Sequence, residues 1–200
     1  MRRKVMARVA WSVRWDCHEE ALWCDRGDGD GATECLGYVS EQAEGQIACI
    51  VRDGKPVRDA KDGDEVAVIM NQTPFYAESG GQMGDAGVLF TADGGKVTIS
   101  DTKKRVGDLH VHMGKVSTGA IRVGQAAQLS VDGTRRGQLR ANHSATHLLH
   151  EALRRRLGEH ITQKGSLVAP DRLRVDISQP VGLKSEELQT VGRDVNNQVR

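Results

Sequence analysis

Residues 140–157 read Arg140-Ala-Asn-His-Ser-Ala-Thr-His-Leu-Leu-His-Glu-Ala-Leu-Arg-Arg-Arg-Leu157. This stretch predicts a helix of about four turns, because its leucines recur at four-residue spacing and give the helix an apolar face. Asn142 is a typical N-cap residue, and Gly158 is typical of the position just past a helix C-terminus. The arginines at 154–156 suit the negative end of the helix dipole. We therefore expect the helix to begin near Asn142 and to end at Leu157.

Two histidines on this helix lie four residues apart. At that spacing the imidazoles of His143 and His147 project from one side, one turn above the other. A helix offers two nitrogen ligands to one zinc ion in this way. Ser144 follows His143 where a metalloprotease needs a glutamate base, so the pattern is not that of a zinc protease. Two ligands do not complete a zinc site, and ordinary helix histidines remain the alternative interpretation.

Composition excludes several classes of protein. Lys and Arg total 28 against 27 Asp and Glu, a net charge of +1, so bulk charge does not indicate a nucleic-acid binder. No apolar run approaches the ~18 residues of a membrane span, and no signal-peptide core follows Met1. We expect a cytoplasmic protein with neither a membrane nor a DNA partner. Any contact with RNA must come from local clusters of arginines, namely Arg135, Arg136, Arg140 and Arg154 to Arg156.

The four cysteines, Cys17, Cys24, Cys35 and Cys49, all lie in the first quarter of the chain. Without a secretory signal, disulfides are not expected. Cys17, His18 and Cys24 are an alternative metal site, although their spacing fits no compact zinc motif.

From residue 45 the apolar pattern changes to short strands separated by glycine-rich turns. Gln46–Arg52 and Lys55–Arg58 flank Asp53-Gly54, a typical hairpin turn. Further strands are expected at Glu65–Met70, Gly87–Thr91, Lys96–Asp101, Leu109–Val116 and Gln128–Asp132. Short strands at this density favour a small antiparallel barrel. A second helix is expected from Ser185 to Arg200, with acidic residues in its first turn.

A glycine-rich loop lies between two of these strands: Thr73-Pro-Phe-Tyr-Ala-Glu-Ser-Gly-Gly-Gln-Met-Gly-Asp-Ala-Gly87. Glycines let a backbone approach a ligand closely and expose its N–H groups. No Gly-Lys-Ser/Thr follows, so the loop is not a nucleotide-binding P-loop. A tight connection between two strands is the alternative interpretation.

Together these stretches resemble the alanyl-tRNA synthetase family. The resemblance rests on residues 73–82, on residues 140–149, and on Gln163-Lys-Gly-Ser-Leu-Val168 followed by Pro170-Asp-Arg-Leu-Arg174, and weaker similarity extends upstream to Ala7. It implies an α+β protein: a small antiparallel β-barrel followed by an incomplete α/β editing domain. That domain would be of the second-additional-domain type shared by threonyl- and alanyl-tRNA synthetases. The class II domain that activates alanine with ATP is expected before residue 1.

The resemblance also implies three regions and a function. Residues 1–44 would be a linker, residues 45–135 the barrel with the glycine-rich loop, and residues 136–200 the N-terminal part of the editing domain. In this family the editing domain hydrolyses tRNA(Ala) wrongly charged with serine or glycine, so the expected partner is the acceptor end of tRNA(Ala).

Site residues follow from matching the family's motifs. His143 and His147 match the first two zinc ligands, and the family supplies the others from a later Cys-x-x-x-His motif. No cysteine follows Cys49 here, so we expect weak or absent zinc and no hydrolysis by these residues alone. The loop matches the element that senses the amino-acid side chain. The expected substrate contacts are Thr73, Glu78, Gly80, Gly81, Gln82 and Gln163.

Two alternative functions stay open. One is a free-standing alanyl-tRNA editing deacylase, and the other is a non-catalytic tRNA-binding or decayed fragment. Cys24, Cys35, Val175 and Ile177 stand where the family pattern has Phe, which favours decay. In the editing interpretation, substrate reading and hydrolysis must occur within about 10 Å of each other. We therefore expect the glycine-rich loop and the histidine helix to face one cleft.

Overall fold

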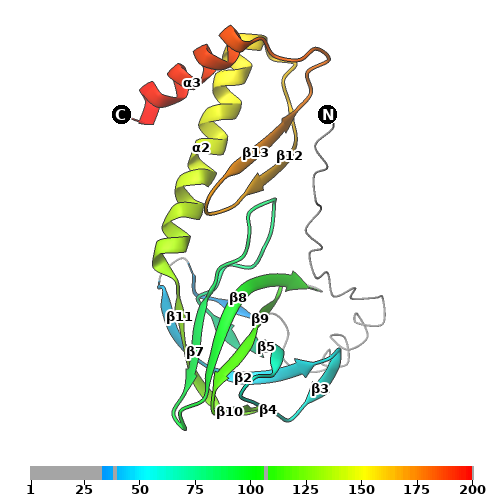
Figure 1. Cartoon of the computed structure of the whole chain (residues 1–200), viewed down its shortest axis with the longest axis vertical. Helices are drawn as coiled ribbons and strands as arrows, with labels where there is room; N and C mark the ends of the chain where they lie inside the picture. The colour runs from blue at the N-terminus through cyan, green and yellow to red at the C-terminus, as the bar shows by residue number, and fades with distance from the viewer. Residues whose placement is uncertain (1–32, 38–39, 106–107, 200) are drawn as a thin grey trace, which may run out of the picture.

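The computed structural model describes residues 33–37, 40–105 and 108–199 (Figure 1). A β-barrel occupies one end of the molecule, a layer of helices and a β-hairpin occupies the other, and the long helix α2 connects the two. The alternative metal site at Cys17, His18 and Cys24 lies outside the described residues, as does most of the predicted linker.

The barrel is antiparallel, as the strand pattern predicts. Its strand order is β11-β7-β8-β9-β5-β2, and pairing of β11 with β2 closes the ring. Its members are β2 (Gln42–Arg52), β5 (Glu65–Met70), β7 (Gly87–Thr91), β8 (Lys96–Arg105), β9 (Leu109–Thr118) and β11 (Ala126–Val131). Each lies where a strand was expected, within a few residues at the ends, because period-two patterns and Gly turns mark them locally.

Shorter strands extend the barrel. The hairpin of β2 with β3 (Lys55–Val57) turns at Asp53 and Gly54, with φ of 51° and 70°, the positive values that a two-residue hairpin turn needs. Two further pairs join β4 (Asp59–Lys61) with β10 (Ala120–Arg122), and β1 (Glu34–Cys35) with β6 (Gln72–Thr73).

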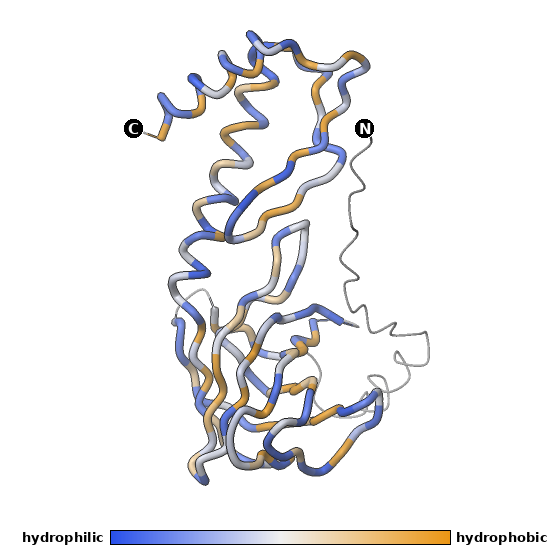
Figure 2. The backbone as a smooth tube through the Cα atoms, viewed as in Figure 1, coloured by the Kyte–Doolittle hydropathy of each residue, from blue (hydrophilic) through white to orange (hydrophobic). Residues whose placement is uncertain are grey.

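Aliphatic side chains fill the barrel. Alternate residues of the strands are buried in the barrel core. Hydrophilic and hydrophobic residues alternate along stretches of these strands in Figure 2. Phe75, from the glycine-rich loop, is fully buried among them. The innermost aliphatic residues include Ile47, Ile50, Val68, Leu89, Val97, Val116, Ile121 and Leu129. A core of this kind agrees with an aromatic content of only 4%.

Helix α2 (Gly133–Leu157) begins nine residues before the predicted start, so the expectation of an N-cap at Asn142 was wrong. Asp132 is the N-cap, and its carboxylate accepts the N–H of Arg135 at 3.0 Å. Asn142 instead donates its amide Nδ2 to the carbonyl oxygen of Ala169 at 2.7 Å. The predicted C-terminus is confirmed, because Gly158 has φ of 114° and donates its N–H to the carbonyl of Arg154.

The layer beside α2 contains α3 (Ser185–Val199) and an antiparallel hairpin of β12 (Gln163–Val168) and β13 (Leu173–Ile177). Helix α3 confirms the second expected helix, whereas the hairpin was not predicted as strands. A second apolar cluster joins the two helices around Leu153, Ile161 and Val191. The predicted boundary between residues 135 and 136 falls inside α2. Within the described residues, no helix is both long and apolar enough to cross a membrane.

Candidate functional site

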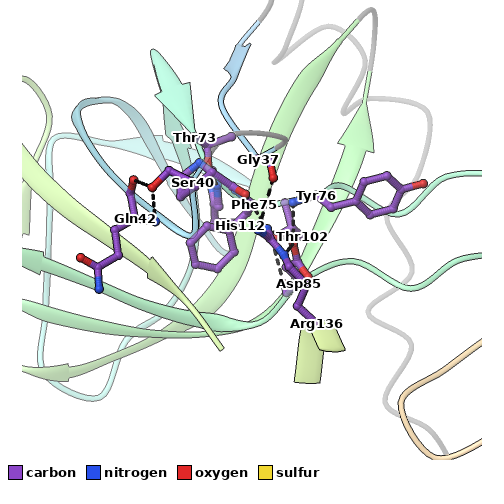
Figure 3. A network of polar contacts seen from close by, with 11 residues as sticks. Gly37, Ser40, Gln42, Thr73, Phe75, Tyr76, Asp85, Thr102, His112 and Arg136 are labelled. Carbon is purple, nitrogen blue, oxygen red and sulfur yellow. Dashed lines mark hydrogen bonds and ion pairs between the residues drawn. The ribbon is translucent and has the colours of Figure 1, made fainter. Parts of the chain in front are cut away.

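The base of the glycine-rich loop is clamped to the first turns of α2. Arg136 is only 8% exposed and donates from Nε and Nη2 to Oδ2 of Asp85, at 3.1 and 2.5 Å. The same guanidinium donates to the carbonyl oxygens of Pro74 at 2.6 Å and Gly37 at 3.4 Å (Figure 3). Asp85 also accepts the N–H of Tyr76 at 2.7 Å. One buried ion pair thus fixes both ends of the loop to one helix.

The first loop residue points into the barrel. Thr73 is fully buried, and its hydroxyl lies 2.7 Å from Nε2 of His112, a buried residue of β9 (Figure 3). Nδ1 of His112 lies 2.9 Å from the carbonyl oxygen of Val68, so Nδ1 carries the proton and Nε2 accepts from Thr73. Burial without solvent lowers the pKa of His112 to about 4, so the ring is neutral at physiological pH.

The tip of the loop is a tight turn that docks on the hairpin. Ser79 and Gln82 exchange backbone hydrogen bonds around Gly80 and Gly81, whose φ values are 59° and 84°. Beyond the turn, Val168 of β12 donates its N–H to the carbonyl of Gly81 at 2.8 Å. The carbonyl of Val168 accepts the N–H of Met83 at 3.0 Å, so this part of the loop adds a short strand to the edge of β12.

The loop tip meets the histidine pair. Oε1 of Gln82 lies 2.6 Å from Nδ1 of His143, and Nε2 of His143 lies 3.1 Å from Nε2 of His147. The two rings are 4.9 Å apart between centroids and are tilted by 49°. Both histidines are exposed. This contact confirms that the loop and the helix converge at one place.

The spacing of the two imidazoles suits one tetrahedral metal ion. Zinc bound at Zn–N distances of about 2.0–2.1 Å holds two ligand nitrogens about 3.3 Å apart. The two Nε2 atoms here are separated by 3.1 Å, so little movement would be needed. Among the described residues, no three His, Cys, Asp or Glu side chains gather closely enough to hold a metal. The pair can therefore fill two positions around a metal ion.

The other predicted site residues lie at different distances from this pair. Gly80 and Gly81 form the tip itself, whereas Thr73 faces the barrel interior. Glu78 is exposed and pairs with Lys103 of β8, with Nζ to Oε2 at 3.1 Å. Gln163 begins β12 at the end opposite Val168, about 16 Å along the strand. The structure thus brings Gln82 to the histidine pair, with Gly80 and Gly81 in the same turn, and leaves the other three predicted residues elsewhere.

Three of the six predicted arginines form ion pairs within the protein. Arg136 is buried against Asp85, so it cannot contact RNA. Arg155 pairs with Glu151 on the helix surface, and Arg156 pairs with Asp194 of α3. Arg140, one turn before His143, is exposed. Only the partner of Arg155 is local in the sequence, because Asp85 and Asp194 reach Arg136 and Arg156 through the fold.

The sequence analysis did not predict the ion pair of Arg136 with Asp85, which holds the glycine-rich loop against α2. A usable signal exists, because Arg136 precedes His143 by seven residues and therefore shares its helix face. The predicted helix start at Asn142 hid this relation by leaving Arg136 outside the helix. Ser166 was also missed; its Oγ donates to the carbonyl of Gly80 at 3.2 Å.

A groove of about 340 Å³ lies away from the loop, between α2 and α3. Its charged lining residues, such as Glu151, Arg155 and Asp194, already form ion pairs with neighbours. It contains no histidine or cysteine. The chemistry therefore favours the loop tip and the histidine pair as the functional site.

Comparison with known proteins places this chain in a family. The family described as tRNA synthetases class II (A) matches residues 10–135, more than half of the chain. The alanine–tRNA ligase of Sphingopyxis alaskensis is 52% identical over 198 residues, and that of Mesorhizobium japonicum is 53% identical over 194 residues. These alignments cover 99% and 97% of this chain, which spans 22% of the length of each relative. The chain belongs to the family of class II (A) tRNA synthetases, in a region that it shares with alanine–tRNA ligases.

Proposed function

We propose that this chain is the part of an alanine–tRNA ligase that joins a β-barrel to the first half of an editing site. The site would take part in hydrolysing tRNA(Ala) wrongly charged with serine or glycine. The contact between Gln82 and His143 carries the proposal, because it brings a loop with open polar groups to the histidine pair. A loop that only connected two strands would not need to reach helix α2.

His143 and His147 would hold a zinc ion through their Nε2 atoms, and bound zinc would polarise the ester carbonyl or a water molecule. The two histidines supply the geometry for this role, since their Nε2 atoms already lie 3.1 Å apart. A metal-ligating histidine usually donates its other ring N–H to an oxygen. Gln82 offers such an oxygen to His143.

The tip of the glycine-rich loop would recognise the amino-acid part of the substrate. Among the described hydrogen bonds, none uses the N–H of Gly80 or Gly81, so these donors remain open in the turn that carries Gln82. Open donors suit an oxygen of the amino-acid ester. A site that hydrogen-bonds a serine hydroxyl rejects alanine, because alanine would leave buried polar groups unpaired. Thr73 would act indirectly, through the barrel, since its hydroxyl is occupied by His112.

The proposal is tested in a chimera, because these residues supply only two metal ligands. The matching segment of the Sphingopyxis alaskensis ligase, 52% identical, is replaced by this chain. We expect the chimera to deacylate Ser-tRNA(Ala), and we expect His143→Ala and His147→Ala to reduce this rate by tenfold or more. Alanylation of tRNA(Ala) is the control and should not change. If both variants deacylate as fast as the parent chimera, the histidines have no part in editing.

Among the alternatives, the non-catalytic fragment is favoured for these 200 residues in isolation. The observation is that no third metal ligand lies beside the histidines in the described part of the chain. We therefore expect neither deacylation nor alanylation by the isolated chain. The measurement is release of serine from Ser-tRNA(Ala), with the chimera as the positive control.

A further inference from the structure

We propose that Gln82 is a positioning residue for the histidine pair: its amide oxygen holds His143 in the tautomer with the proton on Nδ1. In that form the lone pair of Nε2 faces His147. The functional meaning rests on the proposed metal role of the pair, but the tautomer itself can be observed without any metal.

The hydrogen bonds determine which nitrogen of each ring carries the proton. Oε1 of Gln82 can only accept, so at 2.6 Å it requires a proton on Nδ1 of His143. A neutral His143 then has a bare Nε2, which accepts from Nε2–H of His147 at 3.1 Å. A metal ion that binds both Nε2 atoms would take the place of that proton, which a neutral His147 would then carry on Nδ1, and nothing would change at Gln82. The opposite tautomer would place a proton on the nitrogen of His143 that must bind the metal.

The backbone of Gln82 is held on both sides. The residue before it, Gly81, accepts a hydrogen bond from Val168, and the residue after it, Met83, donates one to Val168. Gln82 itself is bonded to Ser79 across the turn. These backbone bonds fix the Cα of Gln82. A side chain that orients a metal-binding imidazole needs such a fixed backbone.

Helix α2 supplies the matching frame. Arg136, His143 and His147 are separated by seven and four residues, so all three lie on one helix face. Arg136 fixes the base of the loop to this face through Asp85, and Gln82 contacts the same face two turns later. Docking of the loop is already provided by backbone bonds to β12, so the amide of Gln82 is not needed as an anchor. Its contact with His143 is better explained as orientation of the ring.

The experiment uses the metal-free 200-residue chain and three variants. Gln82→Met keeps the length of the side chain but removes the acceptor. Gln82→Glu keeps an oxygen that can only accept, and Glu78→Met is the control elsewhere on the loop. Long-range proton–nitrogen NMR of the imidazoles at pH 8, where histidines are neutral, reports the tautomer of His143. We expect the Nδ1–H form in the wild type, Gln82→Glu and Glu78→Met, and a shift towards the Nε2–H form in Gln82→Met.

Zinc titration of the same four proteins supplies the second readout. Loss of an outer hydrogen-bond partner typically weakens metal binding about 10–100-fold, so Gln82→Met should bind zinc that much more weakly than the wild type. Gln82→Glu should stay closer to the wild type. The proposal is overturned if wild-type His143 carries its proton on Nε2, if Gln82→Met leaves the tautomer unchanged, or if Glu78→Met shifts it equally. A wild type that shows the expected tautomers and binds no zinc supports the role of Gln82, and the metal part of the proposed function is then decided by the histidine variants of the chimera.

Discussion

Arg136 joins three segments that are distant in the sequence. Its guanidinium contacts the carboxylate of Asp85 and the carbonyl oxygens of Gly37 and Pro74. A planar fork with five donors can make these bonds together, which a lysine could not. Because the pair is almost completely buried, each charge depends on the other for compensation.

The first prediction concerns removal of this charge. Arg136→Met should lower the free energy of unfolding by about 3–5 kcal/mol, because Asp85 would be left buried without a partner. Urea unfolding followed by circular dichroism measures the change. Arg155→Met is the matched control, since Arg155 lies on the same helix and pairs with an exposed Glu151, and its midpoint should hardly move. Equal midpoints for the two variants would show that the buried pair is not a clamp.

The second prediction concerns pH and His112. Its folded-state pKa of about 4 lies below the ordinary value of 6.5, so protonation favours the unfolded chain. The contribution of His112 to stability is complete above about pH 6.5, falls as the pH drops to about 4, and is lost below that. The total loss should be about 3 kcal/mol.

The matching variant is His112→Gln, because an amide can bond both Thr73 and the carbonyl of Val68. Unfolding free energy measured from pH 7.5 to 4 should fall less steeply in the variant than in the wild type. Burial also lowers the pKa of His110, which contributes a slope of the same sign in both proteins. The difference between the two slopes therefore reports His112 together with its repulsion by His110, and identical slopes would show that its ring is not buried in the neutral form.

At the scale of elements, the glycine-rich loop is held to β12 through a turn that contains Gly80 and Gly81. Only Gly81 lies where a side chain would collide with β12. A Cβ at Gly81 would lie 2.5 Å from the carbonyl oxygen of Ser166, whereas a Cβ at Gly80 would meet open space. Both residues have positive φ. Asn tolerates this conformation better than most residues, so an Asn substitution separates crowding from backbone strain.

The third prediction is that Gly81→Asn detaches the loop from β12 and Gly80→Asn does not. Amide hydrogen exchange at Met83 and Val168 is the measurement, because these N–H groups form the bonds between loop and strand. Exchange should speed up at both positions in Gly81→Asn and stay close to the wild type in Gly80→Asn. Similar exchange in the two variants would mean that crowding against Ser166 has no effect on docking.

The elements were predictable to different degrees. The barrel strands follow from local alternation and from turns such as Asp53-Gly54. The predicted start of α2 was wrong because Asp132 caps the helix, with a carboxylate that accepts an N–H of the first turn. Asn142 instead bonds Ala169 across space, and no spacing rule gives that contact. The hairpin β12–β13 depends on packing against α2, which the local pattern does not encode.

At the scale of the molecule, α2 connects the barrel at one end of the protein to the helices and hairpin at the other, and it bears the histidine pair between them. Its first turns anchor the barrel through Arg136, its middle carries the histidines, and its last turns pack against α3. Convergence of the loop and the histidines was predicted from the resemblance, because the editing hypothesis requires the two motifs to lie close together. The sequence predicted that Gln82 contacts the substrate. Its contact with His143 could be found only in the structure.

The last prediction concerns metal binding by the whole chain. Two imidazoles leave half of a tetrahedral coordination shell to water, so zinc should bind weakly and be lost on dialysis. Metal analysis of the dialysed 200-residue chain should give far less than one zinc per chain. In a titration with added zinc, His143→Ala and His147→Ala should each remove the residual binding, whereas His160→Ala, which changes a histidine bonded to Gln179 outside the pair, should not. Near-stoichiometric zinc that survives His143→Ala would mean that the ligands lie elsewhere in the chain, because one remaining imidazole cannot retain the ion through dialysis.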